Sequence, residues 1–192
     1  MKRHEIETLL HTAVEGYDAE RAYQERDAWH SLKFRQVIEL AAAGKTADGG
    51  RNGHLWTLSR ATAVRFTYAL EAIRPGLKRA GDFAAMYALV DKVGHVTQGV
   101  NTRRRSSVTV YDTAFALAAN RGFKPLEVHL HASPGKAAAL LGLHPDRGRS
   151  TLLHKQLPGA LRTWEAWQVE DILCELWRLY KKAHQEATQP TG

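Results

Sequence analysis

Three consecutive arginines, Arg103–Arg105, are followed seven positions later by an acidic residue, Asp112. Guanidinium groups match the geometry of phosphate oxygens, and the hydroxyl and amide side chains that flank the trio also contact phosphates. Asp112 lies in the apolar segment VTVYDTAFALA, where a partly buried carboxylate is expected. The stretch 90–122 therefore predicts a phosphate-binding segment with a carboxylate close to it. The alternative is a charged, solvated loop.

The overall charge agrees with an anionic partner. The 192 residues include 27 Lys and Arg against 20 Asp and Glu, which gives a formal charge of +7 and a pI of about 9.7. Net charge is evidence about association and not about fold. A second basic cluster offers the same chemistry as the arginine trio: Arg147, Arg149, His154 and Lys155.

Two other motifs could carry chemistry: a segment similar to a P-loop and a pair of histidines. GKT at 44–46 resembles the end of a P-loop, but Glu39 occupies the place of the first glycine, and the preceding segment has a helical pattern rather than that of a strand. His129 and His131 alternate in a segment with a strand pattern, so their rings share one side. With His144, Asp146 or His154 they could ligate a metal, which makes a metal-dependent hydrolase a third hypothesis.

The central stretch resembles helix-hairpin-helix DNA glycosylases. That family carries a hairpin of the type L-P-G-V-G-x-K-T, and Val90–Thr97 (VDKVGHVT) is similar to it. After a helix and a loop the family has V-D-T-H-x-x-R-x-x-x-R, and Val110–Thr113 (VYDT) followed by Asn120-Arg121-Gly122 is similar, with Tyr111 inserted. The resemblance covers about 33 residues, 90–122. It implies a turn near Gly94 whose amides bind a DNA phosphate, and a flipped base beside it.

The resemblance also implies roles for individual residues. Asp112 would be the catalytic carboxylate. Asp91 and Lys92 stand where the family has proline and glycine, Ala114 replaces its histidine, and Val96 stands where bifunctional members carry an amine, so the activity would be monofunctional. The DNA-binding residues would be Lys92, Gly94, His95, Thr97, Arg103, Arg104, Arg105 and Arg121.

Hydrophobic periodicity predicts a compact all-α fold with a short strand or extended segment near 126–131. We expect helices over 3–14, 18–43, 55–73, 82–93, 108–120, 134–141 and 164–184, with Gly44 and Gly122 ending two of them. The chain would form one domain, 1–187, with a disordered tail at 188–192.

The remaining observations concern location and the runner-up function. A single cysteine, Cys174, excludes a disulfide framework and a cysteine-ligated cluster. No signal peptide or membrane span is evident, so we expect a cytoplasmic protein with DNA as partner and without a metal or cofactor. The alternative to a glycosylase is a non-catalytic module that binds nucleic acid or another protein. The sequence gives no oligomeric state.

Overall fold

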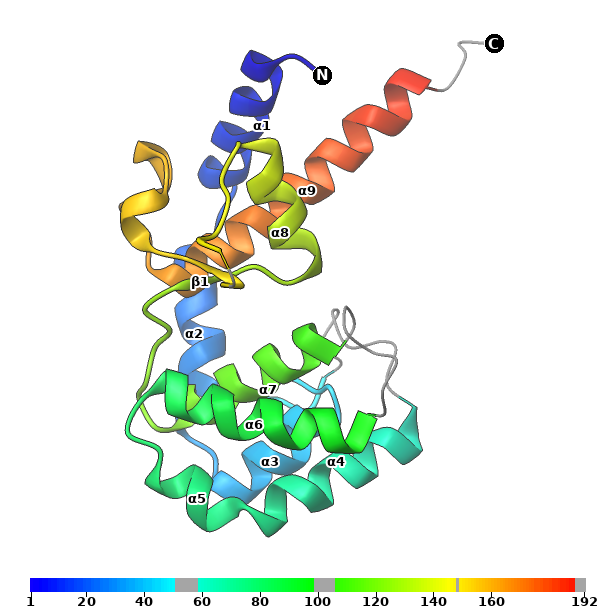
Figure 1. Cartoon of the computed structure of the whole chain (residues 1–192), viewed down its shortest axis with the longest axis vertical. Coiled ribbons are helices and arrows are strands. Elements are labelled where there is room, and N and C mark those ends of the chain that lie inside the picture. The colour runs from blue at the N-terminus through cyan, green and yellow to red at the C-terminus, as the bar shows by residue number, and fades with distance from the viewer. Residues whose placement is uncertain (51–58, 99–105, 148, 189–192) are drawn as a thin grey trace. The chain divides into compact units, whose positions relative to one another are not determined.

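The computed structural model describes residues 1–50, 59–98, 106–147 and 149–188. Within these residues all the regular structure is helical except for one two-stranded sheet, which confirms the all-α prediction (Figure 1). None of the described helices has the length and apolarity that a membrane span requires. The elements are α1 (Arg3–Glu15), α2 (Ala19–His30), α3 (Phe34–Ala42), α4 (Arg60–Ala72), α5 (Arg74–Arg79), α6 (Phe83–Gln98), α7 (Ser106–Asn120), β1 (Val128–His129), α8 (Ala132–Leu140), β2 (Thr151–Leu152), the 3₁₀ turns η1 (His154–Gln156) and η2 (Gly159–Leu161), and α9 (Ala166–Thr188).

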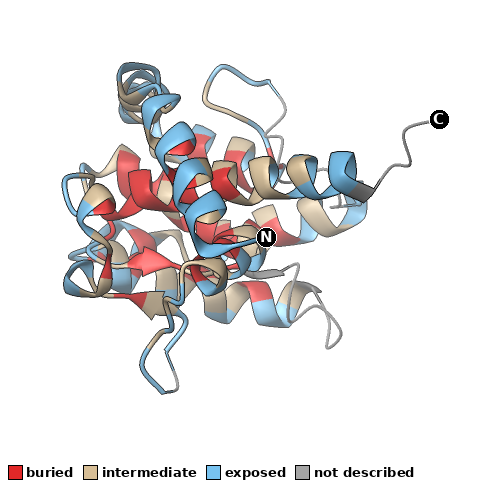
Figure 2. Cartoon of the chain, turned by 90° about the horizontal axis from the view of Figure 1, so that it is seen from above, coloured by how far each residue is buried: buried red, intermediate tan, exposed pale blue. Residues whose placement is uncertain are grey.

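The chain divides into two compact units, where the sequence predicted one domain. Unit 1 contains Met1–Ala19 and Leu126–Gly192, and unit 2 contains Glu20–Pro125. Each unit has its own cluster of buried apolar side chains. Figure 2 shows buried positions along one side of the helices and exposed positions along the other, as amphipathic helices around a core require.

Four helices form the core of unit 2. α3 packs against α4 and α7, α4 packs against α6, and α6 packs against α7, so the four contacts close a ring. The side chains at its centre are fully buried: Ile38, Phe66, Leu70, Met86 and Leu117. α7 is the most buried member, because small and apolar residues cover most of its circumference.

The predicted helix over 18–43 is wrong in one respect, because it is broken between α2 and α3 at Ser31–Lys33. The break leaves carbonyl groups at the end of α2 without helical partners. Asn120, at the end of α7, supplies them: its Nδ2 donates to the carbonyl oxygens of Trp29 at 2.8 Å and Leu32 at 2.9 Å. A residue about 90 positions away in the sequence thus holds the corner.

Replacing Asn120 with alanine is expected to lower the free energy of unfolding by about 1–3 kcal/mol, because the Leu32 carbonyl loses its donor and the Trp29 carbonyl keeps only the Leu32 amide at 3.3 Å. Asn120→Asp should cost at least as much, since an ionised carboxylate accepts hydrogen bonds but cannot donate them. Urea denaturation followed by circular dichroism measures both values. Ser31→Ala is the control: the exposed Ser31 hydroxyl donates to the carbonyl of Ala28, and its loss should change stability by less than about 0.5 kcal/mol.

Unit 1 combines α1, α8 and α9 with a two-stranded sheet. β1 and β2 are antiparallel, with Val128 opposite Leu152 and His129 opposite Thr151. The strand expected near 126–131 is therefore present but covers two residues. α9 supplies three of the large, fully buried side chains of this core: Ile172, Leu173 and Leu176.

Helix ends follow the predicted chemistry. Gly44 and Gly122 lie two residues after the last residue of α3 and of α7, and both have left-handed backbones, with φ of 68° and 76°. In this region a side chain would be strained, so glycine is the natural terminator. The Asp82 carboxylate accepts from the Ala85 amide at 2.8 Å and caps α6.

Candidate nucleic-acid interface

Residues 92–97 do not form the expected hairpin. They are the last turns of α6, which runs without interruption from Phe83 to Gln98. Inside a helix the backbone N–H groups donate to carbonyl groups four residues earlier, so they are not available to a phosphate. The sequence departs from the family motif at the point that matters, because Asp91 and Lys92 are ordinary helix residues where a turn needs proline and glycine.

Gly94 has a different role from the predicted one. It is buried, and its φ is not among the positive values of the described glycines. A Cβ atom built on Gly94 would lie 2.7 Å from Cγ2 of Val110 in α7 and 4.0 Å from Cε2 of Phe66 in α4. The glycine therefore permits close helix packing and is not a ligand-binding position.

The other predicted residues of α6 divide between surface and helix. Lys92 and His95 are exposed, and His95 Nε2 lies 3.5 Å from the carboxylate of Asp91. The Thr97 hydroxyl donates to the Val93 carbonyl at 2.9 Å, inside its own helix. Of the predicted α6 residues, Lys92 thus remains as an exposed cation without a described partner.

Arg103, Arg104 and Arg105 lie outside the described residues, between the end of α6 at Gln98 and the start of α7 at Ser106. Arg121 follows the opposite end of α7. The 15 residues of that helix are about 22 Å long, so Arg121 lies about 22 Å from the first residue of α7, Ser106. The Arg121 guanidinium donates to the Lys78 carbonyl and lies 5.3 Å from the centre of the Phe123 ring. These contacts give Arg121 a structural role.

Asp112 lies on α7 between two buried residues, Tyr111 and Thr113, and is itself partly exposed. Around it the Tyr111 ring contacts Phe83 edge-on, with ring centres 5.8 Å apart, and stacks on Phe115 at 6.3 Å. The carboxylate is thus held on a packed helix beside aromatic side chains. Its catalytic role stays a prediction.

The distribution of charge over the two units is the feature that the sequence analysis missed. Unit 2 contains 17 Lys and Arg and nine Asp and Glu, a net charge of +8, whereas unit 1 contains 10 and 11, a net charge of −1. The whole surplus of positive charge therefore belongs to unit 2. The signal was present in the sequence, but it needed the boundaries of the units to become visible.

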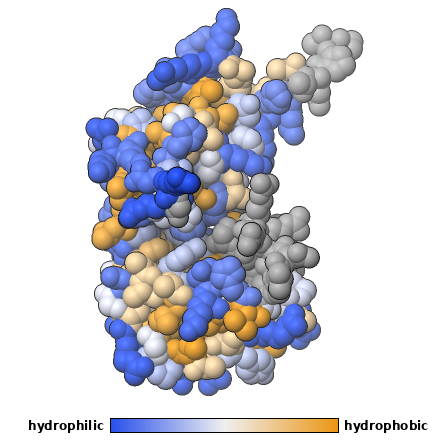
Figure 3. Space-filling model, viewed as in Figure 1, coloured by the Kyte–Doolittle hydropathy of each residue, from blue (hydrophilic) through white to orange (hydrophobic). Residues whose placement is uncertain are grey.

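Much of this charge is not neutralised locally. In the described part of unit 2, seven exposed cations have no ion-pair partner: Lys33, Lys45, Arg60, Arg65, Lys78, Arg79 and Lys92. Figure 3 shows hydrophilic and hydrophobic residues interleaved on the visible face of this unit.

Unit 1 contains a buried polar cluster. His131 Nε2 lies 2.6 Å from Glu170 Oε1, and the Cys174 thiol donates to the same oxygen at 3.5 Å. Burial raises the pKa of Glu170 to about 7, partly offset by the hydrogen bond from Cys174. Burial, and then the charge of His131, lowers the pKa of His129 to about 4. At neutral pH this interior thus favours neutral over charged groups.

This cluster does not amount to a metal centre. Among the described residues no group of three or more His, Cys, Asp and Glu side chains is placed to hold a metal ion. The partners suggested from the sequence are engaged elsewhere: Asp146 accepts from Gln156 Nε2 at 3.3 Å, and His154 Nε2 is 3.1 Å from the Trp164 carbonyl oxygen. The third hypothesis, a metal-dependent hydrolase, gains no support from this geometry.

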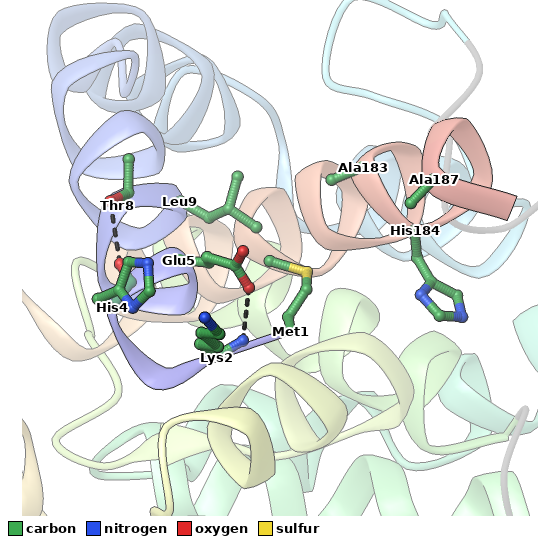
Figure 4. A pocket seen from close by; sticks show the side chains of 9 residues that line it. All are labelled: Met1, Lys2, His4, Glu5, Thr8, Leu9, Ala183, His184 and Ala187. Atoms are coloured by element: carbon green, nitrogen blue, oxygen red, sulfur yellow. Dashed lines mark hydrogen bonds between the residues drawn. The ribbon is translucent and has the colours of Figure 1, made fainter.

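A depression between the start of α1 and the end of α9 is also lined by two histidines, His4 and His184 (Figure 4). Its other polar groups serve the helix. The Glu5 carboxylate accepts from the Lys2 amide, and the Thr8 hydroxyl donates to the His4 carbonyl at 2.9 Å. The depression contains no constellation for catalysis among the residues that line it.

Comparison of the chain with protein-family models, with curated proteins and with solved structures finds no match.

Proposed function

We propose that the protein binds nucleic acid through unit 2 and does not act on it chemically. The observation that carries this proposal is the unequal distribution of charge: unit 2 has a net charge of +8 and unit 1 has a net charge of −1. A phosphate backbone is the commonest polyanion that meets such a surface, and counterion release makes its binding favourable. The unpaired arginines and lysines of α4, α5 and α6 would contribute directly.

The non-catalytic form of the proposal is supported by the helix at 92–97. The glycosylase resemblance needs a hairpin there, and α6 provides none. Asp112, the predicted catalytic residue, is placed on a helix whose neighbouring positions are packed. Binding does not need either feature.

The affinity of the full chain for a labelled nucleic-acid 20-mer is expected to fall steeply as the salt concentration rises. A plot of log K against log[salt] should be linear, and its slope reports the number of neutralised phosphates. Fluorescence anisotropy between about 25 and 200 mM salt measures it. Replacing Arg103, Arg104 and Arg105 with alanine should lower the affinity and reduce the slope by up to about 3.

The matched control removes three exposed cations of unit 1: Arg147, Lys155 and Lys181. Its charge change is identical, so equal losses in both triple variants would contradict the assignment to unit 2. A glycosylase would instead produce abasic sites in a panel of damaged duplexes, and Asp112→Asn would abolish them. That result would overturn the non-catalytic proposal.

A further inference from the structure

The outer face of α4 exposes an aromatic ring between cations. We define the α4 outer face as Arg60, Val64, Arg65 and Tyr68, which fall within about 140° of the helix circumference at 3.6 residues per turn and so lie on one side of the helix. Tyr68 is 74% exposed and Val64 is 46% exposed. On the opposite side of α4 the side chains of Phe66 and Leu70 are fully buried.

Neither charge nor packing within the described structure accounts for this face. α4 has one acidic residue, Glu71, and its carboxylate lies 3.0 Å from the Arg74 guanidinium. Arg60 and Arg65 are therefore left without a carboxylate on their own helix. Tyr68 differs from Tyr111 of the same unit, whose ring packs among other aromatic side chains. An exposed ring forgoes the free energy of burial, about 25 cal/mol per Å² of apolar area.

The combination fits one chemistry. Guanidinium groups pair with phosphates, and a flat exposed ring stacks on a base. In a duplex the bases are stacked on one another inside the helix. Tyr68 could contact a base face there only if the base were first unstacked, which costs free energy. A single strand offers base faces and phosphates together. Arg60 and Tyr68 are about 12 Å apart along the helix axis, which is room for about three stacked nucleotides.

We infer that the α4 outer face binds single-stranded nucleic acid, with Tyr68 stacked on a base and Arg60 and Arg65 paired with the flanking phosphates. This inference depends on the proposed function of unit 2 and narrows it to a class of ligand. The ring and phosphate contacts are common to DNA and RNA, so both are tested.

The test measures binding of the full chain to a labelled 15-mer of mixed sequence as single-stranded DNA, single-stranded RNA and duplex DNA, each at the same series of salt concentrations between about 25 and 200 mM. We expect the single strand of one or both chemistries to bind more tightly than the duplex. Tyr68→Ala should weaken that binding by about 5- to 150-fold, while Tyr68→Phe, which keeps the ring, should retain it. Arg60→Ala and Arg65→Ala should each reduce the salt slope for the single strand by about 0.7.

Val96→Ala is the matched control, since it shortens an exposed aliphatic side chain of α6, outside the α4 outer face, without removing a ring or a charge. It should alter affinity by less than about 2-fold, and circular dichroism should show equal folding of all variants. If wild-type protein binds nucleic acid but prefers the duplex, or if Tyr68→Ala binds single strands as well as wild type does, the inference is overturned and the proposed function survives. If wild-type protein binds none of the three oligonucleotides at low salt, the proposed function itself fails.

Discussion

Replacing Gly94 with leucine is expected to lower the free energy of unfolding of unit 2 by about 3 kcal/mol or more. The position has no room for a side chain, because even a Cβ atom would lie 2.7 Å from Val110 Cγ2. Val110 cannot give way easily: it is 1% exposed, and a β-branched side chain on a helix has one strongly preferred rotamer. α6 and α7 would have to separate, which would open the core around Phe66.

Helix propensity works against this expected loss and so makes the result easier to interpret. Leucine favours a helix over glycine by nearly 1 kcal/mol, so a destabilised variant reports packing and not backbone preference. Gly76 is the matched control. It also lies in a helix, α5, but its nearest neighbour would be Leu89 Cδ1 at 4.0 Å from an added Cβ. Gly76→Ala should therefore be neutral or stabilise by up to about 1 kcal/mol.

A double-mutant cycle isolates the contact. Gly94→Ala in the wild-type background should destabilise, because the new methyl group meets Val110 Cγ2. In a Val110→Ala background the same change should be neutral or stabilising, because the obstruction is gone and alanine is the better helix former. Urea denaturation of the four proteins gives the coupling free energy. A coupling near zero would show that the two residues do not meet as described.

Gly94 also shows where sequence reasoning fails. A hairpin and a tight helix crossing both need a residue without a Cβ, so the glycine alone does not distinguish them. Hydrophobic periodicity predicted a helix over 82–93, and the resemblance to a hairpin then favoured a turn near Gly94 in place of further helix. The structure extends α6 to Gln98 because nothing after Asp91 breaks the helix.

The helical segments and their glycine ends could be predicted because both depend on local sequence. The break between α2 and α3 could not, since its carbonyl partner is the side chain of Asn120. The same limit applies to the histidine pair. His129 and His131 drew attention through their spacing, yet the groups that decide their environment, Glu170 and Cys174, come about 40 residues later on α9. Their positions in the sequence do not indicate that Glu170 and Cys174 lie next to the histidine pair in the fold.

The second large effect concerns this buried cluster. In Glu170→Gln protein the free energy of unfolding of unit 1 is expected to fall, relative to wild type, as the pH is lowered from 6.5 to 4. His129 has its pKa lowered to about 4 by burial and then by His131. Between these pH values His129 binds a proton in the unfolded chain but not in the folded chain, so lowering the pH favours unfolding. A shift of this size corresponds to roughly 3 kcal/mol across the window.

Glu170 has the opposite sign. Burial raises its pKa to about 7. Between pH 4.5 and 7 the folded chain keeps a proton that the unfolded chain releases, so its contribution to stability is present at low pH and is lost as the pH rises. In His129→Gln protein this contribution remains, and the free energy of unfolding should rise relative to wild type as the pH is lowered from 7 to 4.5. In wild-type protein the two contributions largely offset each other.

Urea denaturation at pH 4.5, 5.5, 6.5 and 7.5, followed by tryptophan fluorescence, measures these profiles. Three of the five tryptophans, Trp164, Trp167 and Trp177, belong to unit 1 and report its unfolding. His144→Gln, at an exposed position of the same unit, is the control and should follow the wild-type profile. The double variant Glu170→Gln/His129→Gln should also return to a profile close to that of wild type, because it removes both opposing contributions. Profiles of the two single variants that run parallel to each other would contradict the opposite signs, and with them the burial of both groups.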